Sequence, residues 1–159
     1  MPLLGTITLL GSALVAGVFF TFSSFVMKAL ARLPSSGAIA AMQSINVVVI
    51  NPSFLGAFMG TAVLSLVVGG FAVVGWSHPS APYFLGGTVF YFVGTFLVTL
   101  VGNVPLNNQL AAVSASDPTS VKLWEHYLAR WTMWNHIRTA AATVAALMYI
   151  LALMQIGPK

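Results

Sequence analysis

The chain lacks cysteine and carries very little charge. Only 5% of its 159 residues are charged, with six Lys or Arg against two Asp or Glu. Without cysteine there are no disulfides, thiolate metal ligands or thiol nucleophiles. The net charge of +4 comes from scattered cations rather than a cluster on a polar face, so nucleic acid is not an expected partner. A soluble domain usually has about a quarter of its residues charged, and this chain could not cover a surface in water.

The residues that are present indicate lipid as the solvent, since 58% of them are hydrophobic. Four apolar runs, at about 3–27, 52–76, 83–102 and 131–156, are long enough to span a membrane, which takes about 20 residues. We therefore expect an all-α integral membrane four-helix bundle, forming a single domain over 1–159. A short extra helix is expected at 38–50. The last helix, from about 119 to 156, is too long for the membrane alone, so its first turns should protrude.

The cations predict how the chain is oriented. Lys28 and Arg32 flank the first connection, Lys122 and Arg130 flank the third, and the second connection has no cation. By the positive-inside rule the two charged connections are cytoplasmic. Both termini are then on the non-cytoplasmic side, and we expect the protein in a bacterial inner membrane.

This topology brings most of the polar side chains to one end of the bundle. The end of the first span, the short helix, the end of the third span and the start of the fourth all lie at the cytoplasmic face. We expect the third helix to end near Pro105, because proline removes a backbone donor and restricts the residue before it. The side chains expected to meet at this end are Gln43, Asn46, Asn103, Asn107, Asn135 and Arg138.

A helical wheel at 100° per residue sorts the side chains of the last helix. One face carries Trp124, Tyr127, Trp131, Asn135 and Arg138, with Trp134 at its edge and His136 well away from it. We expect Trp131 to form a pocket wall. Trp124 and Tyr127 are expected in an aromatic belt at the membrane interface.

Arg138 is the strongest candidate for function. A charge within an apolar run costs about 2.5–3.5 kcal/mol on insertion scales, and the only acids, Asp117 and Glu125, are expected near the surface. Two interpretations stay open. Arg138 either binds an anionic ligand, or it reaches the interface or the broken end of the third helix and ties helices together.

Histidines and glycines give weaker patterns. His136 or His126 could act as a general base or bind haem, but three histidines without matching carboxylates do not predict a metal site. Gly56 and Gly60 form a GxxxG pattern, which permits close helix approach. Glycine and alanine on other helix faces are expected to leave a slot for a ligand.

Three motifs together resemble a known family. They are Met42-Gln-x-Ile-Asn46, Asn103-Val-Pro-Leu-Asn-x-x-Leu110 and Trp134-Asn-x-x-Arg-Thr139. In this order, over nearly the whole chain, they are similar to those of the DUF1772 family, the anthrone-oxygenase-like small membrane proteins. Fungal members are associated with the oxidation of anthrones to anthraquinones by O₂, without a conventional cofactor. The resemblance assigns site positions to Gln43, Asn46, Asn103, Asn107, Trp134, Asn135 and Arg138.

Two hypotheses follow from the resemblance and the residues. The first is a cofactor-independent monooxygenase that acts with O₂ on a lipophilic phenolic or anthrone-type aromatic molecule. Its catalytic residues would be Arg138, Asn135 and His136, and its substrate-binding residues are expected to be Gln43, Asn46, Asn103, Asn107, Trp131 and Trp134. The alternative is a membrane protein that binds a lipid, a quinone or haem, or a small subunit of a complex. The expected partners are membrane lipid and a lipophilic aromatic molecule, and a homo-oligomer stays open.

Overall fold

A computed structural model of the chain describes residues 1–156. Four of its helices are long and apolar enough to cross a membrane: Pro2–Leu30, Pro52–Val74, Ala81–Ala111 and Ser120–Met154. No strand occurs among the described residues. The prediction of an all-α integral membrane bundle is confirmed, as are the short extra helix after the first span and the length of the fourth helix.

Some of the long helices contain π-helical segments. The elements are α1 (Pro2–Thr21), η1 (Phe22–Val26), α2 (Met27–Leu30), α3 (Ser35–Val48), α4 (Pro52–Val74), α5 (Ala81–Tyr91), η2 (Phe92–Leu97), η3 (Thr99–Asn103), α6 (Val104–Ala111) and α7 (Ser120–Met154). Here η1, η2 and η3 are π-helical, so the first and third long helices continue through wider turns. Such turns place an extra residue in the helix and are frequent at functional sites.

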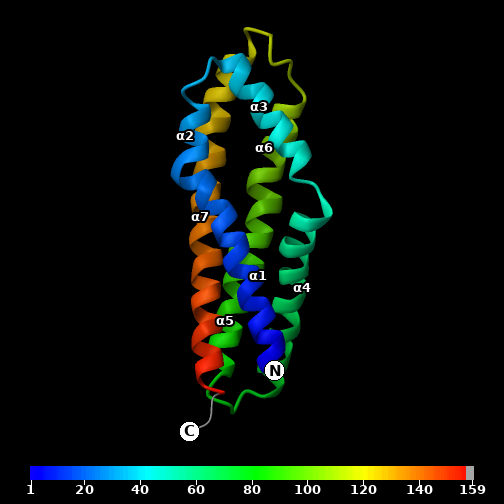
Figure 1. Cartoon of the computed structure of the whole chain (residues 1–159), viewed down its shortest axis with the longest axis vertical. Helices are drawn as coiled ribbons and strands as arrows, with labels where there is room; N and C mark the ends of the chain where they lie inside the picture. Colours follow the sequence, from blue (N-terminus) through cyan, green and yellow to red (C-terminus); the bar gives the residue numbers. More distant parts are fainter. Residues whose placement is uncertain (157–159) are drawn as a thin grey trace.

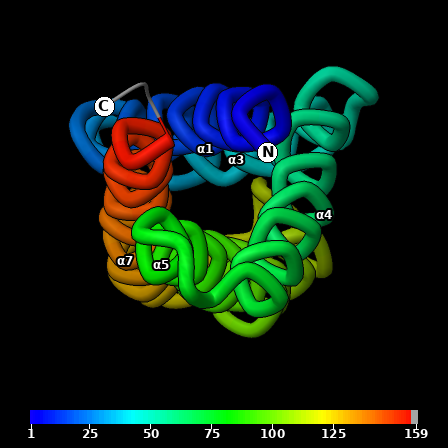
Figure 2. The backbone as a smooth tube through the Cα atoms, turned by 90° about the horizontal axis from the view of Figure 1, so that it is seen from below, coloured from blue at the N-terminus to red at the C-terminus, as the bar shows by residue number. Residues whose placement is uncertain are grey.

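The four long helices form a closed ring. α1 packs against α7 and α4, and α5 packs against the same two helices from the opposite side (Figure 2). The N-terminus and the end of α7 lie at one end of the bundle, beside the α4–α5 connection (Figure 1). The two connections that carry the cations lie at the other end, with α3 and α6. Which end faces the cytoplasm stays a prediction.

The predicted end of the third helix near Pro105 is wrong. The helix continues through Pro105 and ends at Ala111. Pro105 is the second residue after η3, and the backbone N–H of Val104 bonds the Thr99 carbonyl, five residues back. A wider π turn moves the preceding carbonyls away from the position where the proline ring would meet them, so the helix need not break.

Glycines bring the helices together in the half of the bundle that holds the termini. We call the part formed by residues 2–15, 61–74, 81–91 and 142–154 the closed half, and the remainder the open half. A Cβ added to Gly87 would lie 2.5 Å from the ring of Tyr149, and one added to Gly69 would lie 2.7 Å from the Thr88 hydroxyl. The GxxxG glycines make no such approach, because a Cβ on Gly56 or Gly60 would meet nothing within 4 Å.

The start of α7 differs from the expectation in two ways. Trp124 and Tyr127 are buried, with 4% and 1% of their surface exposed, so they do not form an interfacial belt. They stack in a row with Trp131 instead, at ring separations of 5.6 and 6.1 Å. α3 and α6 pack against α7, which explains why apolar rings are covered there by protein.

Candidate functional site

The five residues predicted to share a face of α7 do share one. Trp124, Tyr127, Trp131, Asn135 and Arg138 are all buried, whereas their neighbours His136 and Ile137 are exposed. The helical repeat alone was enough for this, because α7 is a continuous α-helix and side chains three and four residues apart fall on the same side. The face points into the bundle, where α1, α3, η3 and α6 meet it.

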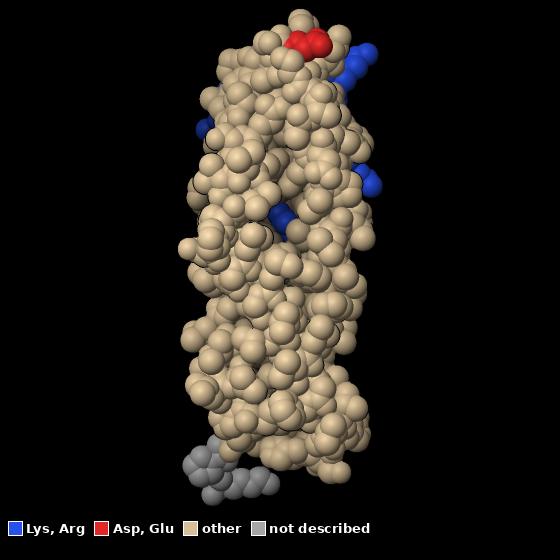
Figure 3. All heavy atoms as spheres, turned by 90° about the vertical axis from the view of Figure 1, so that its right-hand side faces the viewer, with Lys and Arg blue, Asp and Glu red and all other residues tan. Residues whose placement is uncertain are grey.

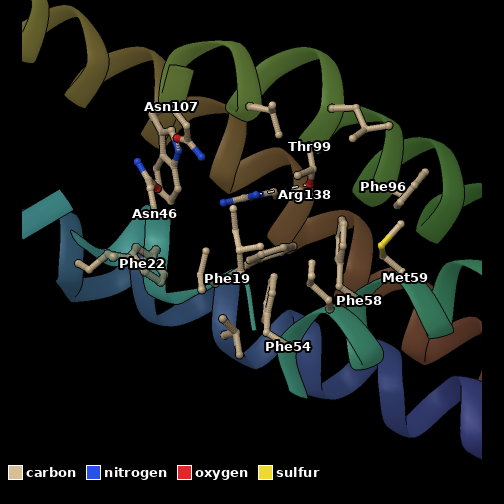
Figure 4. A pocket seen from close by; sticks show the side chains of 18 of the residues that line it. Phe19, Phe22, Asn46, Phe54, Phe58, Met59, Phe96, Thr99, Asn107 and Arg138 are labelled. Carbon is tan, nitrogen blue, oxygen red and sulfur yellow. Dashed lines mark hydrogen bonds between the residues drawn. The ribbon is translucent and has the colours of Figure 1, made fainter. Parts of the chain in front are cut away.

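A cavity of about 280 Å³ lies beside Arg138 in the open half. Ligand pockets in proteins typically measure roughly 300–1,000 Å³, so this one suits a small molecule. Its walls are mostly apolar, and six of the nineteen lining residues are aromatic, with rings from α1, η1, α4, η2 and α7. These are Phe19, Phe22, Phe54, Phe58, Phe96 and Trp131 (Figure 4). Arg138, Asn46, Asn107 and Thr99 form the polar part of the lining.

Arg138 is held by contacts that leave part of its guanidinium unused. Its Nε donates to the Asn135 side-chain oxygen at 3.0 Å, and its Nη1 donates to the Thr99 hydroxyl at 3.4 Å. Its guanidinium carbon, Cζ, lies 3.9 Å from the centre of the Phe19 ring and 4.9 Å from that of Trp131. Within residues 1–156, no protein group accepts a hydrogen bond from Nη2. This donor is therefore available to a molecule in the cavity.

The charge of Arg138 has no carboxylate partner in the described part of the chain. Only 5% of the residue is exposed, while both acids, Asp117 and Glu125, lie on the surface. The two aromatic rings supply about 0.5–2 kcal/mol each as cation–π contacts, but they do not neutralise the charge. A buried, unneutralised cation at the wall of an empty apolar space favours an anion as the ligand.

Asn135 fixes the position of Arg138. Its amide nitrogen donates to the Phe19 carbonyl at 2.8 Å and to the Ser23 hydroxyl at 2.7 Å. Both acceptors lie where α1 passes into η1, so the π turn and α7 are joined at this point. The amide oxygen is thereby oriented toward Arg138. Asn135 itself does not line the cavity, and it acts by positioning the arginine.

A second chain of hydrogen bonds determines which atoms of Asn46 and Asn107 are left as donor or acceptor for a ligand. The indole N–H of Trp131 can only donate, and it lies 2.8 Å from the Asn107 side-chain oxygen. The Tyr127 hydroxyl donates to the same oxygen at 2.8 Å, and Asn46 donates its amide nitrogen to that hydroxyl at 3.4 Å. The indole thus orients both amides, leaving the Asn107 NH₂ and the Asn46 oxygen to interact with a ligand.

Besides Asn135, four of the residues expected at the site do not line the cavity. Gln43 donates to the carbonyls of Leu110 and Val113 at the end of α6, at 2.8 and 2.9 Å, so it holds α3 to α6. Asn103 donates to the Trp131 carbonyl at 3.2 Å, and its own oxygen is buried without a partner among residues 1–156. Trp134 packs over Gly102.

His136 is the fourth residue that lies elsewhere. It is exposed, and it lines a separate hollow with Lys28 on the outer surface between α2 and α7. It follows Asn135 by one residue, so the 100° step of the helix turns its side chain away from the cavity. His126 is also exposed. The structure therefore gives neither histidine access to the space beside Arg138.

Trp131 lines the cavity as expected of a pocket wall, but the phenylalanine lining was not predicted. Phe19 and Phe22 line the cavity, whereas Phe20 and Phe25 are 60% and 59% exposed. In a membrane helix both faces are apolar, so composition does not separate them. The spacing could have separated them, because Phe19 and Phe22 are three residues apart and fall on the same helix face as the small buried residues of α1. The slot is not left by glycine and alanine as expected, because large rings form its walls.

A polar cleft adjoins the cavity at the end of the bundle. It lies between α3 and α6 and shares Asn46, Ile50, Val104 and Asn107 with the cavity, while Gln43 and Asn108 line only the cleft. Asn46 and Asn107 therefore stand at the boundary between an apolar space and a polar one. The arrangement can bind a flat apolar molecule with an oxygen at Arg138, and it can admit water from the opposite side.

The comparison with protein families identifies the chain. Within residues 1–156 no three His, Asp or Glu side chains are close enough to share a metal ion. No curated protein and no solved structure matches the chain. The family model of anthrone oxygenase matches residues 51–148, more than half of the chain, and confirms the resemblance seen in the motifs. The matched segment contains the cavity groups of α4, η2, η3, α6 and α7, and the chain belongs to the anthrone oxygenase family.

Proposed function

We propose that this protein is a membrane oxygenase that oxidises a lipophilic anthrone-type aromatic molecule with O₂. One observation carries the proposal: an unneutralised, buried guanidinium with a free donor stands at the polar end of an aromatic-lined cavity. Family membership gives the reaction class. Fold or family alone would not assign a substrate, but the cavity's chemistry agrees with this one.

The reaction needs an anion of the substrate. An anthrone carries a ketone opposite a CH₂ group, and loss of one proton from that CH₂ gives an enolate whose charge rests largely on the former ketone oxygen. This electron-rich anion transfers an electron to O₂, and the two radicals combine to form a C–O bond at the former CH₂. Loss of water then gives the quinone. The sum is anthrone plus O₂ giving anthraquinone plus water, so the substrate supplies all the electrons.

Arg138 would stabilise the enolate oxygen. Its free Nη2 and the Asn107 NH₂ are donors that face the same space, and in Figure 4 the guanidinium lies between Thr99 and the pair Asn46 and Asn107. Donors fixed in a low-dielectric site lower the energy of a developing oxyanion strongly, because they need not reorganise. They lower the pKa of the substrate C–H group for the same reason. The Phe19 and Trp131 rings would stack against the fused rings.

The proton would leave through the polar cleft. No imidazole or carboxylate is among the described residues that line the cavity, so the histidines proposed as bases do not fill this role. Water in the cleft can accept the proton at the boundary formed by Asn46 and Asn107, since the Arg138 charge makes the substrate more acidic. The same route removes the water that the reaction forms.

The test is oxygen consumption with anthrone as the substrate. The protein is reconstituted in phosphatidylcholine liposomes, and anthraquinone is measured alongside O₂ uptake. Arg138→Gln should lower kcat/KM by about 10²–10³-fold, the usual effect of removing an oxyanion donor. Arg130→Gln is the matched control, because Arg130 is exposed on the same helix.

Two outcomes would reject the proposal. One is full activity in Arg138→Gln, with its helix content and elution volume unchanged from the wild type. The other is a wild-type protein that binds anthrone but consumes no O₂, which would indicate a binding protein instead.

A further inference from the structure

The cavity opens on the side of the bundle. The lining residues with the most exposed side chains are Ile50, Met59 and Leu100, at 69%, 50% and 46%. Met59 is on α4, Leu100 is on η3, and Ile50 precedes the turn into α4. Figure 3 shows a basic group at the bottom of a hollow, part way along the molecule, with no other charged group around it on this face. Among the described residues, Arg138 is the only Lys or Arg that lines the cavity.

The opening follows from how α4 is packed. α4 packs against α1, α5 and η2, but no comparable packing joins it to η3 or α6 within residues 1–156. The ring of helices is therefore closed by side chains in one half and parted at the level of Met59 and Leu100 in the other. Side chains at this rim are apolar and face outward, where the surrounding medium is the hydrocarbon of the bilayer.

We propose that the cavity is loaded sideways from the bilayer, through the opening between α4 and η3, by a flat fused-ring molecule with one acidic oxygen. The identity of this ligand rests on the proposed function, but the route does not. A fused-ring molecule concentrates in the hydrocarbon, so it meets the rim without first crossing water. Its oxygen then reaches Arg138, while the α3–α6 cleft, with four amide side chains among its nine lining residues, admits water from the other side.

The size of the cavity agrees with this ligand. An apolar cavity of about 150 Å³ holds one benzene molecule, and this cavity measures about 280 Å³. It therefore holds a molecule of about two to three fused rings, by proportion to that benzene site. The six aromatic rings in its lining can stack against the faces of a fused-ring molecule, which a flexible acyl chain does not offer.

The route can be tested with a probe that does not react. 9-Anthracenecarboxylate has three fused rings and one carboxylate, and energy transfer from tryptophan reports its binding in stopped-flow measurements on liposomes. Met59→Trp and Leu100→Trp each narrow the opening from one side. We expect both to slow association and dissociation by about tenfold or more, as gating residues do. The affinity should change little, because a gate alters both rates together.

Two variants control for the added indole. Val63→Trp places it on the exposed face of α4, where Val63 is 61% exposed, and Val47→Trp places it in the cleft, where Val47 is 73% exposed. Neither should slow the probe. Slowing by Val47→Trp alone, or unchanged rates in both Met59→Trp and Leu100→Trp, would overturn lateral entry.

The same measurements separate this inference from the proposed function. If the wild type fails to oxidise anthrone but the probe still enters at a rate set by Met59 and Leu100, the reaction assignment fails and the route holds. If anthrone is oxidised equally fast in both opening variants and the control, the route fails and the reaction assignment holds. Arg138→Gln should lower affinity for the probe. Unchanged affinity would show that Arg138 does not bind an acidic oxygen of the ligand.

Discussion

The closed half of the bundle is filled by its side chains, whereas the open half contains a cavity. In the closed half, glycines let rings and hydroxyls approach a neighbouring backbone, as Tyr149 does at Gly87. In the open half, phenylalanines from several helices line a space that they do not fill, and Phe19 on α1 lies 6.1 Å from Phe58 on α4. Lipid gives helices little hydrophobic reason to associate. Tight packing in one half therefore holds the helices together while the other half stays hollow.

The boundary between the halves is where polar groups concentrate. Asn135 and Arg138 lie on α7 just before its small buried residues Ala141, Ala142 and Ala145. Hydrogen bonds from Asn135 to Phe19 and Ser23 join α1 and η1 to α7 here, in addition to close contacts at Gly94 and Gly102. The difference shows that the helices at the site are held in place by directional hydrogen bonds, whereas those of the closed half are held by close packing of side chains.

The largest effect on stability is expected from Gly87→Ala. The new methyl group would overlap the buried Tyr149 ring, and overpacking of this kind costs typically about 1–3 kcal/mol. Gly56→Ala in the open half adds the same atom to an exposed position with nothing nearby. It should leave stability unchanged or raise it by up to about 1 kcal/mol through helix propensity. Unfolding by SDS in mixed micelles measures both, and equal losses would contradict the contrast between the halves.

The next largest effect is expected from Asn135→Leu at the boundary. The variant removes the bond from α7 to the Phe19 carbonyl, which keeps only its bond from the Phe22 backbone N–H, and it leaves the Arg138 Nε without a partner. Bonds between membrane helices contribute about 0.6 kcal/mol on average and up to about 1.7. The SDS midpoint should fall by an amount in this range, and anthrone oxidation should fall further because Arg138 is no longer oriented. Asn108→Leu, in the exposed part of α6, is the control. A loss of stability without loss of activity would show that Arg138 keeps its position unaided.

Much of the fold and part of the site followed from local patterns. The shared face of Trp131, Asn135 and Arg138 depends only on helical repeat within one helix, and the meeting of Asn46 and Asn107 depends on counting spans. The cavity could not be predicted in this way. It depends on π turns, which change the register by a residue and carry no distinctive residue type, and on the parting of α4 from η3. The prediction that the helix ends near Pro105 failed for the same reason, because the sequence does not reveal the π turn that precedes the proline.

A smaller effect, of opposite sign in the two halves, is expected from adding one methyl group. Val18 lines the cavity and Val68 is fully buried in the closed half. Val18→Ile fills empty space, and at roughly 24 cal/mol per Å³ of cavity it should stabilise the fold by about 0.5 kcal/mol. It should also weaken binding of 9-anthracenecarboxylate. Val68→Ile has no space to fill and should destabilise. Stabilisation by both variants in the SDS titration would mean that the closed half also contains unfilled volume.

The smallest effect is expected at Asp117, outside the membrane at the open end of the bundle. Hydrogen bonds from the Thr119 backbone N–H and hydroxyl to this carboxylate, both 2.8 Å, lower its pKa below the ordinary aspartate value. A lowered pKa in the folded state means that these bonds stabilise the turn above about pH 3.9, the ordinary aspartate pKa. This contribution is lost as the pH falls through the lower folded value. The Thr119 amide signal in NMR should therefore titrate with a midpoint below that pKa. Asp117→Asn should abolish the titration and increase hydrogen exchange in the first turn of α7, while Glu125→Gln changes neither. If exchange also increased at Ala145 and Tyr149, the two halves would unfold as one unit rather than separately.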